Sequence, residues 1–272
     1  MKIAYLGPKG SFSEKAAIKL FSNEELIPLQ SIRNIIESVE SGIYEKGIIP
    51  LENFYNGIVM PSVDSLTECE KTKIVDEIEL SIVHCIGALK NNSKIDKILS
   101  HGQALEQCAK YISENYPTAQ TIAVESTARA AEMIKKDNMM NCAAIASKSA
   151  IESNGLIILD EDILPNNNTR FAIISFENSI RTGKDKTLIS IHPKIDKSGI
   201  LFNILKFIAD EKINMKHIHS RPDGKGAYYF ILEIDGHEKD ENVQNAFKNI
   251  RKYLENDESL KILGSYPNRN GR

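Results

Sequence analysis

Up to residue 178, short apolar runs alternate with stretches whose apolar residues recur at helical spacing. Strands that alternate with helices indicate an α/β fold built on a mostly parallel sheet. After the first apolar run we predict a helix over residues 11–21 with Ser13 as its N-cap. The stretches that show this pattern are KIAYL with SFSEKAAIKLF, KGIIPLEN, DKILSHGQALEQCAKYI, QTIAVESTARAAEMIKK and NCAAIASKSAIESNG.

The segment Lys73–Leu89, KIVDEIELSIVHCIGAL, is rich in Ile and Val and holds no helix-capping pattern. β-branched residues favour extended backbone. The segment therefore predicts an extended crossing between two lobes.

Residues 179–185, SIRTGKD, are polar and charged and include a glycine, which is linker composition. The patterns beyond them follow the order β, α, β, β, α, β, which is ferredoxin-like. We expect a large domain over 1–178, a linker over 179–185 and a small domain over 186–268. The patterns of the small domain are TLISIHP, GILFNILKFIADEK, INMKHIHSR, AYYFILEIDG, DENVQNAFKNIRKYL and LKILGSY.

The chain has 272 residues, too many for one average core, and a net charge of -3. A near-neutral balance without a basic stretch disfavours a nucleic-acid partner. No 18 apolar residues run together, and the first residues lack the apolar core of a secretory signal. We therefore expect a cytoplasmic protein with a small-molecule partner and no membrane segment.

The four cysteines, Cys69, Cys85, Cys108 and Cys142, lack the C-x-x-C spacing of a zinc site. We expect them to be reduced core residues. A nucleophilic thiol is conceivable at Cys108, but its apolar register favours packing.

Three histidines invite chemical interpretations. His101 is a candidate proton donor near neutral pH, although a histidine next to a glycine often only makes a turn hydrogen bond. His217 and His219 fall on one face of a predicted strand, which would permit metal ligation. No further ligand accompanies them in the sequence, so packing is favoured and no metal site is predicted.

Small polar residues follow several predicted strands, where the next helix begins. Helix N-termini carry unpaired N–H groups and partial positive charge, so they bind carboxylates or phosphates. Such turns suit a small dianion, although ordinary N-capping explains each one alone. GPKGSFS lacks the spacing of a phosphate-binding loop and of a dinucleotide motif, which disfavours nucleotide binding. The turn residues are Gly7, Gly10, Ser11, His101, Gly102, Ser126 and Thr127.

Glu52 and Asn53 directly follow an apolar strand. Water-excluding surroundings would keep a carboxyl group protonated there, which suits a general acid. Alternatively, Glu52 caps the helix expected near Pro61. Both interpretations stay open.

The stretch PNNNTRFAII, residues 165–174, runs from short hydrogen-bonding side chains into an apolar strand. Such residues close loops through local turns, which needs no function. In a regular strand Thr169 and Phe171 share one face and Arg170 points to the other.

Five stretches in this order, GPKGSFSEKA, PLENFYNGIV, LSHGQALEQC, VESTARAA and NNNTRF, resemble the prephenate dehydratase family. Ser11, Phe54 and Gly102 stand where the family usually has Thr, Ser and Pro. Beyond the linker, SGILFNILKFIADEKINMKHIHSRP and LGSYP resemble the regulatory ACT domain. The resemblance is to the monofunctional form of the enzyme.

The resemblance implies a catalytic domain over 1–178 with two α/β lobes like those of periplasmic binding proteins and the substrate in a cleft between them. It implies decarboxylation of prephenate with loss of the ring hydroxyl, giving phenylpyruvate, carbon dioxide and water. No metal or organic cofactor is expected. The enzyme must orient two carboxylates and assist departure of hydroxide.

The resemblance also implies the roles of individual residues. Thr169 is expected to hydrogen-bond the leaving hydroxyl, with Glu52 or His101 as the proton source. Arg170 either anchors a carboxylate or makes a buried structural pair, and the strand alternation favours the pair. The other expected substrate-binding residues are Gly10, Ser11, Asn53, Gln103, Ser126, Thr127 and Phe171.

In the ACT-like segment the resemblance implies a site for L-phenylalanine at a subunit interface, in a homodimer or homotetramer. His219 stands where the family usually has Glu. The expected effector-binding residues are Gly199, Ile200, Leu201, Phe202, Asn214, His219, Ser220, Arg221 and Pro222.

Two alternatives remain. Arogenate dehydratase acts on a substrate that differs from prephenate only in an amine for a keto group, which the sequence does not separate. A non-enzymatic amino-acid sensor would also combine such domains. It should carry a DNA-binding helix pair or a basic patch, and neither is present in the sequence.

Overall fold

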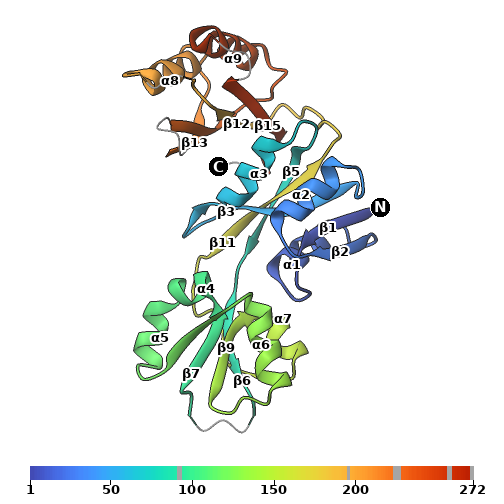
Figure 1. The fold of residues 1–272 in the computed structure, drawn as a ribbon, viewed down its shortest axis with the longest axis vertical. Helices are drawn as coiled ribbons and strands as arrows, with labels where there is room; N and C mark the ends of the chain where they lie inside the picture. Colours follow the sequence, from blue (N-terminus) through green and yellow to red (C-terminus); the bar gives the residue numbers. More distant parts are fainter. Residues whose placement is uncertain (91–93, 195–196, 223–227, 256–258, 270–272) are drawn as a thin grey trace. The chain divides into compact units, whose positions relative to one another are not determined.

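The computed structural model describes residues 1–90, 94–194, 197–222, 228–255 and 259–269 (Figure 1). The chain divides into two compact units. Unit 1 comprises Met1–Ile35, Ile48–Val59 and Glu79–Phe171, and unit 2 comprises Ile36–Gly47, Met60–Ile78 and Ala172–Arg272. Within the described residues, no helix is both long and apolar enough to cross a membrane.

The first sheet has the strand order β2-β1-β3-β11-β5, with β4 paired to β3, and β1 and β2 run parallel. Its strands are β1 (Lys2–Leu6), β2 (Glu25–Leu29), β3 (Lys46–Asn53), β4 (Gly57–Ile58), β5 (Lys73–Ser81) and β11 (Asn168–Ser175). The helices that connect these strands along the chain are α1 (Phe12–Leu20), α2 (Ile32–Glu40) and α3 (Met60–Glu68).

The prediction that Ser13 caps α1 is wrong. Ser11 is the N-cap, and its side-chain oxygen accepts a hydrogen bond from the main-chain N–H of Glu14 at 3.2 Å. Ser13 lies inside the helix and is buried. An N-cap needs extended backbone and a side chain that reaches the third helical residue, and Ser11 meets both conditions.

The second sheet has the order β10-β6-β9-β7-β8. It consists of β6 (His84–Ala88), β7 (Lys97–His101), β8 (Gln120–Val124), β9 (Cys142–Ser147) and β10 (Ile157–Asp160). It lies between α4 (Gly102–Gln107) and α5 (Ala109–Asn115) on one face and α6 (Thr127–Lys136) and α7 (Lys148–Ser153) on the other (Figure 1).

Strand β9 shows how the sequence produces these two faces. Ala143 and Ile145 belong to the core beneath α4 and α5, whereas Ala144 and Ala146 belong to the core beneath α6 and α7. Successive side chains of a strand point to opposite faces, so a strand covered on both sides is apolar throughout. All six residues of β9 are buried.

The expectation of a mostly parallel sheet needs correction here. β6 runs antiparallel to both of its neighbours, β9 and β10, while β7 runs parallel to β8 and β9. The reason lies in the crossing segment. Extended structure over Lys73–Leu89 is confirmed as β5 followed by β6, which belong to different sheets. β6 therefore enters its sheet directly from a strand, without the helical crossover that makes neighbouring strands parallel.

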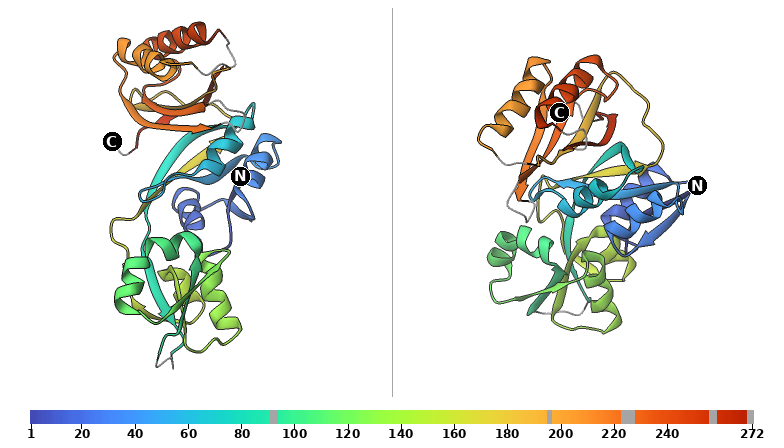
Figure 2. Two further views of the ribbon diagram at one scale, coloured as in Figure 1. Left: turned by 60° about the vertical axis from the view of Figure 1, so that its left-hand side comes forward. Right: turned by 45° about the horizontal axis from the view of Figure 1, so that its top comes forward.

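Residues 179–184 belong to no helix or strand, and β12 begins at Asp185. The predicted βαββαβ order is confirmed, and its sheet has the antiparallel order β13-β14-β12-β15. Both helices lie on one face of this sheet (Figure 2). The elements are β12 (Asp185–Ile191), α8 (Ile200–Asp210), β13 (Met215–Pro222), β14 (Tyr228–Asp235), α9 (Glu241–Leu254) and β15 (Leu260–Pro267).

A buried ion cluster lies in unit 2. Nζ of Lys186 on β12 lies 2.8 Å from Oε1 of Glu77 on β5 and 3.8 Å from Oε1 of Glu233 on β14. The hydroxyl of Tyr266 donates to the same Glu233 oxygen at 2.5 Å. Lys186 is 5% exposed, and the two glutamates are 0% and 1% exposed. One buried cation therefore faces two buried carboxylates. Removing the Lys186 ammonium group would leave both carboxylates without their cation and would destabilise the fold.

Replacing Lys186 with Met should lower the free energy of unfolding by about 3–5 kcal/mol, because two buried carboxylates lose their shared cation. Urea unfolding followed by circular dichroism measures this. Lys184→Met is the matched control, since Lys184 is exposed two residues earlier. Equal stability of the two variants would contradict the assignment.

Candidate active site

The side chain of Asn53 at the end of β3 uses both of its polar atoms. Its Nδ2 donates to Oδ1 of Asn167 at 2.8 Å, to Oγ1 of Thr169 at 3.0 Å and to the main-chain oxygen of Asn168 at 3.2 Å. Its Oδ1 accepts from the main-chain N–H groups of the second and third residues after it, at 3.1 and 3.2 Å. Asn53 is 6% exposed. It ties β3 to the start of β11.

Gln107, the last residue of α4, extends this network. Its Nε2 donates to Oδ1 of Asn53 at 2.9 Å and also to Oδ1 of Asn56. Its Oε1 accepts from Nδ2 of Asn167 at 3.5 Å. A side chain of the second sheet's helical layer thus contacts the last residue of β3, the turn after it and the residue that precedes β11, and all these residues belong to unit 1.

His84, the first residue of β6, adjoins Gln107. It is 4% exposed, and its ring packs edge-to-face on Phe12 with the ring centroids 5.6 Å apart. Burial lowers the pKa of His84 to about 4, and a hydrogen bond with Gln107 opposes this shift. The ring is therefore neutral at pH 7. We call Asn53, His84, Gln107, Asn167 and Thr169 the polar cluster.

Strand alternation sends Thr169 and Arg170 to opposite sides, as predicted. Thr169 is 9% exposed and faces Asn53. Arg170 pairs with Glu52, with Nε and Nη2 at 3.1 and 3.0 Å from Oε2. Of the two roles considered for Arg170, the structure shows the buried ion pair, here with Glu52.

Gly10, which precedes α1, lies beside the first turns of both α6 and α7. The Oγ atoms of Ser11 and Ser126 cap α1 and α6, with Ser126 accepting from the N–H of Arg129 at 3.0 Å. A Cβ on Gly10 would lie 3.8 Å from Cβ of Ala128 in the first turn of α6. The capping interpretation is confirmed at both turns. Binding of a ligand there by Gly10, Ser11, Ser126 and Thr127 stays a prediction.

The remaining candidates lie elsewhere. His101 is exposed and caps α4, where its Nδ1 accepts from the N–H of Gln103 at 3.3 Å. The proton-donor role of His101 and the substrate contact of Gln103 stay predictions. Phe171 is 2% exposed and part of the hydrophobic core, not of an open surface beside Thr169. Phe54, at the family's usual serine position, is 64% exposed and packs edge-to-face on Tyr55.

The sequence motifs do not single out Gln107, Asn167 and His84 as site residues. Gln107 stands in the stretch LSHGQALEQC, from which Gln103 is the predicted substrate contact. The sequence predicts only a turn-forming role for Asn167. His84 interrupts the apolar run SIVHCIGAL, and a polar ring inside a strand expected to be buried was the available signal.

All four cysteines are free and buried, as expected. Burial raises the pKa of the Cys108 thiol to about 12, which opposes its use as a nucleophile. Across the described ranges, no three His, Cys, Asp or Glu side chains gather as a metal site.

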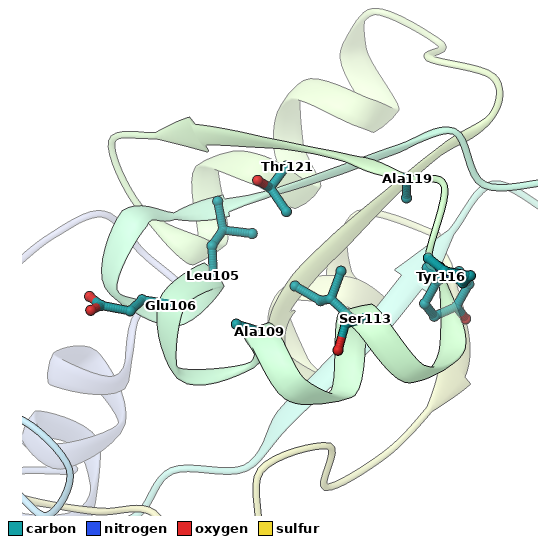
Figure 3. Close-up of a pocket in the computed structure, with 9 residues that line it drawn as sticks. Leu105, Glu106, Ala109, Ser113, Tyr116, Ala119 and Thr121 are labelled. Carbon is teal, nitrogen blue, oxygen red and sulfur yellow. The ribbon is translucent and has the colours of Figure 1, made fainter.

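A separate pocket of about 380 Å³ lies between α4, α5 and β8, with Glu106 at one end and Tyr116 at the other (Figure 3). Its lining is mostly small and apolar, and Glu106 is its one carboxylate. None of the polar-cluster residues lines it. The pocket therefore does not coincide with the candidate site.

The candidate effector residues divide between α8 and β13. Gly199, with φ of +85°, is the N-cap of α8; Ile200 is buried, Leu201 is partly buried and Phe202 is 69% exposed. Asn214 donates from Nδ2 to Oδ2 of Asp235 at 2.9 Å.

On β13, His217, His219, Ser220 and Pro222 are exposed. β13 is an edge strand of its sheet, so the side chains of His217 and His219 are not covered by a further strand. Arg221 lies 3.7 Å from Oδ2 of Asp64 on α3.

The comparisons with known proteins agree on one family. The family model described as prephenate dehydratase matches residues 3–179, and that of the ACT domain matches residues 187–252. A bifunctional chorismate mutase/prephenate dehydratase of Aquifex aeolicus is 36% identical, covering 98% of this chain and 74% of the relative. Arogenate dehydratase 2 of Petunia hybrida is 32% identical, covering 100% of this chain and 73% of the relative.

A crystal structure of prephenate dehydratase in complex with L-Phe from Arthrobacter aurescens superposes with a TM-score of 0.89. It is 30% identical in sequence, and the match covers 100% of this chain and 91% of that one. Fold and comparisons thus define an α/β protein that carries an ACT domain. The chain belongs to the prephenate dehydratase family.

Replacing Asn53 with Asp should lower the free energy of unfolding by about 2–4 kcal/mol, because a donor that faces three oxygens becomes a buried acceptor. Asn56→Asp is the control, since Asn56 is exposed and its Oδ1 still accepts from Gln107. The control should change stability by less than about 0.5 kcal/mol. Urea unfolding measures both, and similar losses would contradict the role given to Asn53.

Proposed function

We propose that this protein converts prephenate to phenylpyruvate, carbon dioxide and water, with the polar cluster at the reacting centre. The hydrogen bond between Nδ2 of Asn53 and Oγ1 of Thr169 carries the proposal. Family membership supplies the reaction, and this bond supplies an oriented hydroxyl in a water-poor setting. The reaction calls for no metal or organic cofactor.

Two bonds of prephenate break. The electron pair of the bond to the departing carboxylate moves into the ring, and the ring carbon–oxygen bond releases the hydroxyl, which takes up a proton to become water. Thr169 accepts from Asn53 through its oxygen, so its own proton is directed away from Asn53 toward the leaving oxygen. A neutral threonine is not a strong acid, so it orients or relays a proton. We retain Glu52 and His101 as candidate proton sources.

Burial of the cluster favours loss of carbon dioxide. A carboxylate that is poorly solvated has less to lose when its charge moves into the ring. Thr169 and Asn53 are 9% and 6% exposed. For the carboxylate that the substrate retains we propose the N-termini of α1 and α6, which both lie near Gly10 and carry partial positive charge.

Thr169→Val keeps the side-chain shape and removes the hydroxyl, so kcat should fall by roughly 10² or more with little change in KM. Thr169→Ser should retain more activity. Ultraviolet absorbance of phenylpyruvate formed from prephenate, without added metal, measures both variants. A valine variant with normal kcat would return NNNTRF to a loop-closing role.

The alternative substrate is arogenate, since a family relative is an arogenate dehydratase. The same assay with arogenate, read as phenylalanine formation, decides between the two. The ratio of kcat/KM for prephenate and arogenate measures the preference.

We also propose that residues 186–268 form a regulatory domain, joined through 179–185 to a catalytic domain over 1–178. L-phenylalanine is its proposed effector in a cytoplasmic homodimer or homotetramer. The Arthrobacter relative was solved with L-Phe, which supports this effector. The proposed effector residues are those named above on α8 and β13, with Asn214.

Asp64 on α3 connects the proposed effector strand to another element of unit 2. Its Oδ2 lies 3.7 Å from Arg221 on β13, and its Oδ1 accepts from the hydroxyl of Tyr229 on β14 at 2.8 Å. The ring of Tyr229 stacks on His192 with the centroids 4.7 Å apart. A change at β13 therefore reaches α3 through one carboxylate.

Asp64→Asn should raise the L-phenylalanine concentration for half-inhibition of prephenate turnover about tenfold, which corresponds to about 1.4 kcal/mol of coupling. Asp76→Asn is the control, because Asp76 also pairs with an arginine, Arg269. An unchanged inhibition curve for Asp64→Asn would show that Asp64 does not couple the effector site on β13 to α3. No inhibition in the wild type would overturn the effector assignment.

A further inference from the structure

The edge strands of the three sheets are protected in nearly every case. An edge strand offers unpaired main-chain N–H and C=O groups, and natural proteins block such an edge with charges, proline, a β-bulge or shortness. β2 carries Glu25 and Pro28, β4 spans only Gly57–Ile58, and β5 carries several charged residues. β10, β13 and β15 each combine a charged residue with a shift in pairing register.

Strand β8, Gln120–Val124, is the exception among the described strands. Within the described residues it has one neighbouring strand, β7, and so forms an edge of the second sheet. Its sequence, QTIAV, has no charged residue and no proline, and its pairing with β7 runs without a register shift. Gln120, Thr121 and Ala123 are exposed. Such an edge is open to pairing with a further strand.

The pairing with β7 determines which main-chain groups of β8 point outward. The N–H of Gln120 donates to the main-chain oxygen of Asp96 at 2.9 Å, on the β7 side. The main-chain groups of successive residues point to opposite sides of a strand within the plane of the sheet. The groups of Ile122 therefore also face β7, and the N–H and C=O groups of Thr121 and Ala123 point away from it.

These outward groups fit a second copy of the same strand. In an antiparallel pair centred on Ile122, Thr121 lies opposite Ala123 of the partner subunit, and these residues exchange both of their main-chain hydrogen bonds. Ile122 then lies opposite its own copy in a pair without hydrogen bonds, as its inward-facing groups require. No like charges meet, because the strand is uncharged and Glu125, just beyond it, faces Ala119. Such an isologous contact closes as a dimer.

The pocket between α4, α5 and β8 lies beside the same edge. Thr121 lines the pocket on its β8 side (Figure 3). A two-fold axis perpendicular to the sheet keeps the α4–α5 layers of both copies on one side of the joined sheet, so the two pockets face each other. Leu105, Ala109 and Ile112 belong to their mostly apolar lining. Pairing therefore adds apolar burial to the main-chain hydrogen bonds.

We propose that β8 is an interface between two copies of this chain, which pair their β8 strands antiparallel about Ile122 and cover the adjoining pocket. The interface lies within unit 1 and outside residues 186–268, so it is separate from the proposed effector site. It does not rest on the proposed reaction. Its failure would leave that reaction untouched, and the tests below do not use activity.

Ile122→Cys tests the two-fold axis directly. In an antiparallel pair without hydrogen bonds the Cα atoms lie about 4.5 Å apart, which suits a disulfide, and the native cysteines are buried. The oxidised variant should run as a covalent dimer on a non-reducing gel and as a monomer after reduction. Val124→Cys is the matched control, because Val124 is also half-buried but lies opposite Gln120 in this register. No cross-link, or equal cross-linking of both variants, would overturn the proposal.

A pair of charge variants tests the register without a cross-link. Thr121→Glu combined with Ala123→Glu sets like charges opposite each other, so the mass in solution should fall to half of the wild-type value. Thr121→Lys combined with Ala123→Glu sets opposite charges at the same positions and should keep the wild-type mass. Sedimentation of the full chain measures the mass, and circular dichroism checks the fold. Wild-type mass in both variants, or a monomeric wild type, would overturn the proposal.

Ala123→Pro tests the main-chain hydrogen bonds. Proline removes the outward N–H of residue 123 and leaves the hydrogen bonds to β7 in place, so the mass should again fall to half. Ala123→Val is the control, since valine keeps the N–H and favours strands. It should keep the wild-type mass. An unchanged mass for Ala123→Pro would leave β8 open to an extended peptide of another protein and would overturn the self-pairing.

Discussion

The double-sided hydrogen bonding of Asn53 is the constraint on which the candidate site depends. One carboxamide holds the start of β11 through its nitrogen and the tip of the β3–β4 hairpin and Gln107 through its oxygen. No other short side chain offers two donors and an acceptor on one planar group. Because the amide is 6% exposed, water does not substitute for a lost partner, so each contact is costly to break.

Successive side chains of a strand point to opposite faces, and this alternation determines which groups surround Asn53. Asn53 and Thr169 meet on one face of the β3–β11 pair, while Glu52 and Arg170 pair on the other. A charged pair and a neutral hydroxyl are thereby separated by the backbone alone, one residue apart in each strand. The neutral face suits a reaction in which negative charge must leave a carboxylate, since a nearby fixed cation would stabilise the starting charge.

Much of the fold follows from the sequence by local rules. Local hydrophobic periodicity is enough to predict the strand KGIIPLEN, the extended crossing Lys73–Leu89 and the βαββαβ order. The direction of β6 was not predictable in the same way, because it depends on which sheet the crossing enters. At the site, Thr169 and Asn53 stand in quoted motifs, but the choice between Gln103 and Gln107 depends on the side of α4 that faces β3. Asn167 becomes a site residue only through contacts with residues far from it in the sequence, which no local pattern predicts.

The most direct test of this account is a double-mutant cycle between Asn53→Ala and Thr169→Val, with kcat for prephenate measured on variants that keep the native circular dichroism spectrum. If Asn53 acts by holding the hydroxyl of Thr169, the double variant should be no slower than the slower single variant. If the two losses in kcat multiply, the residues act independently, and the hydrogen bond between them is not the feature on which catalysis depends.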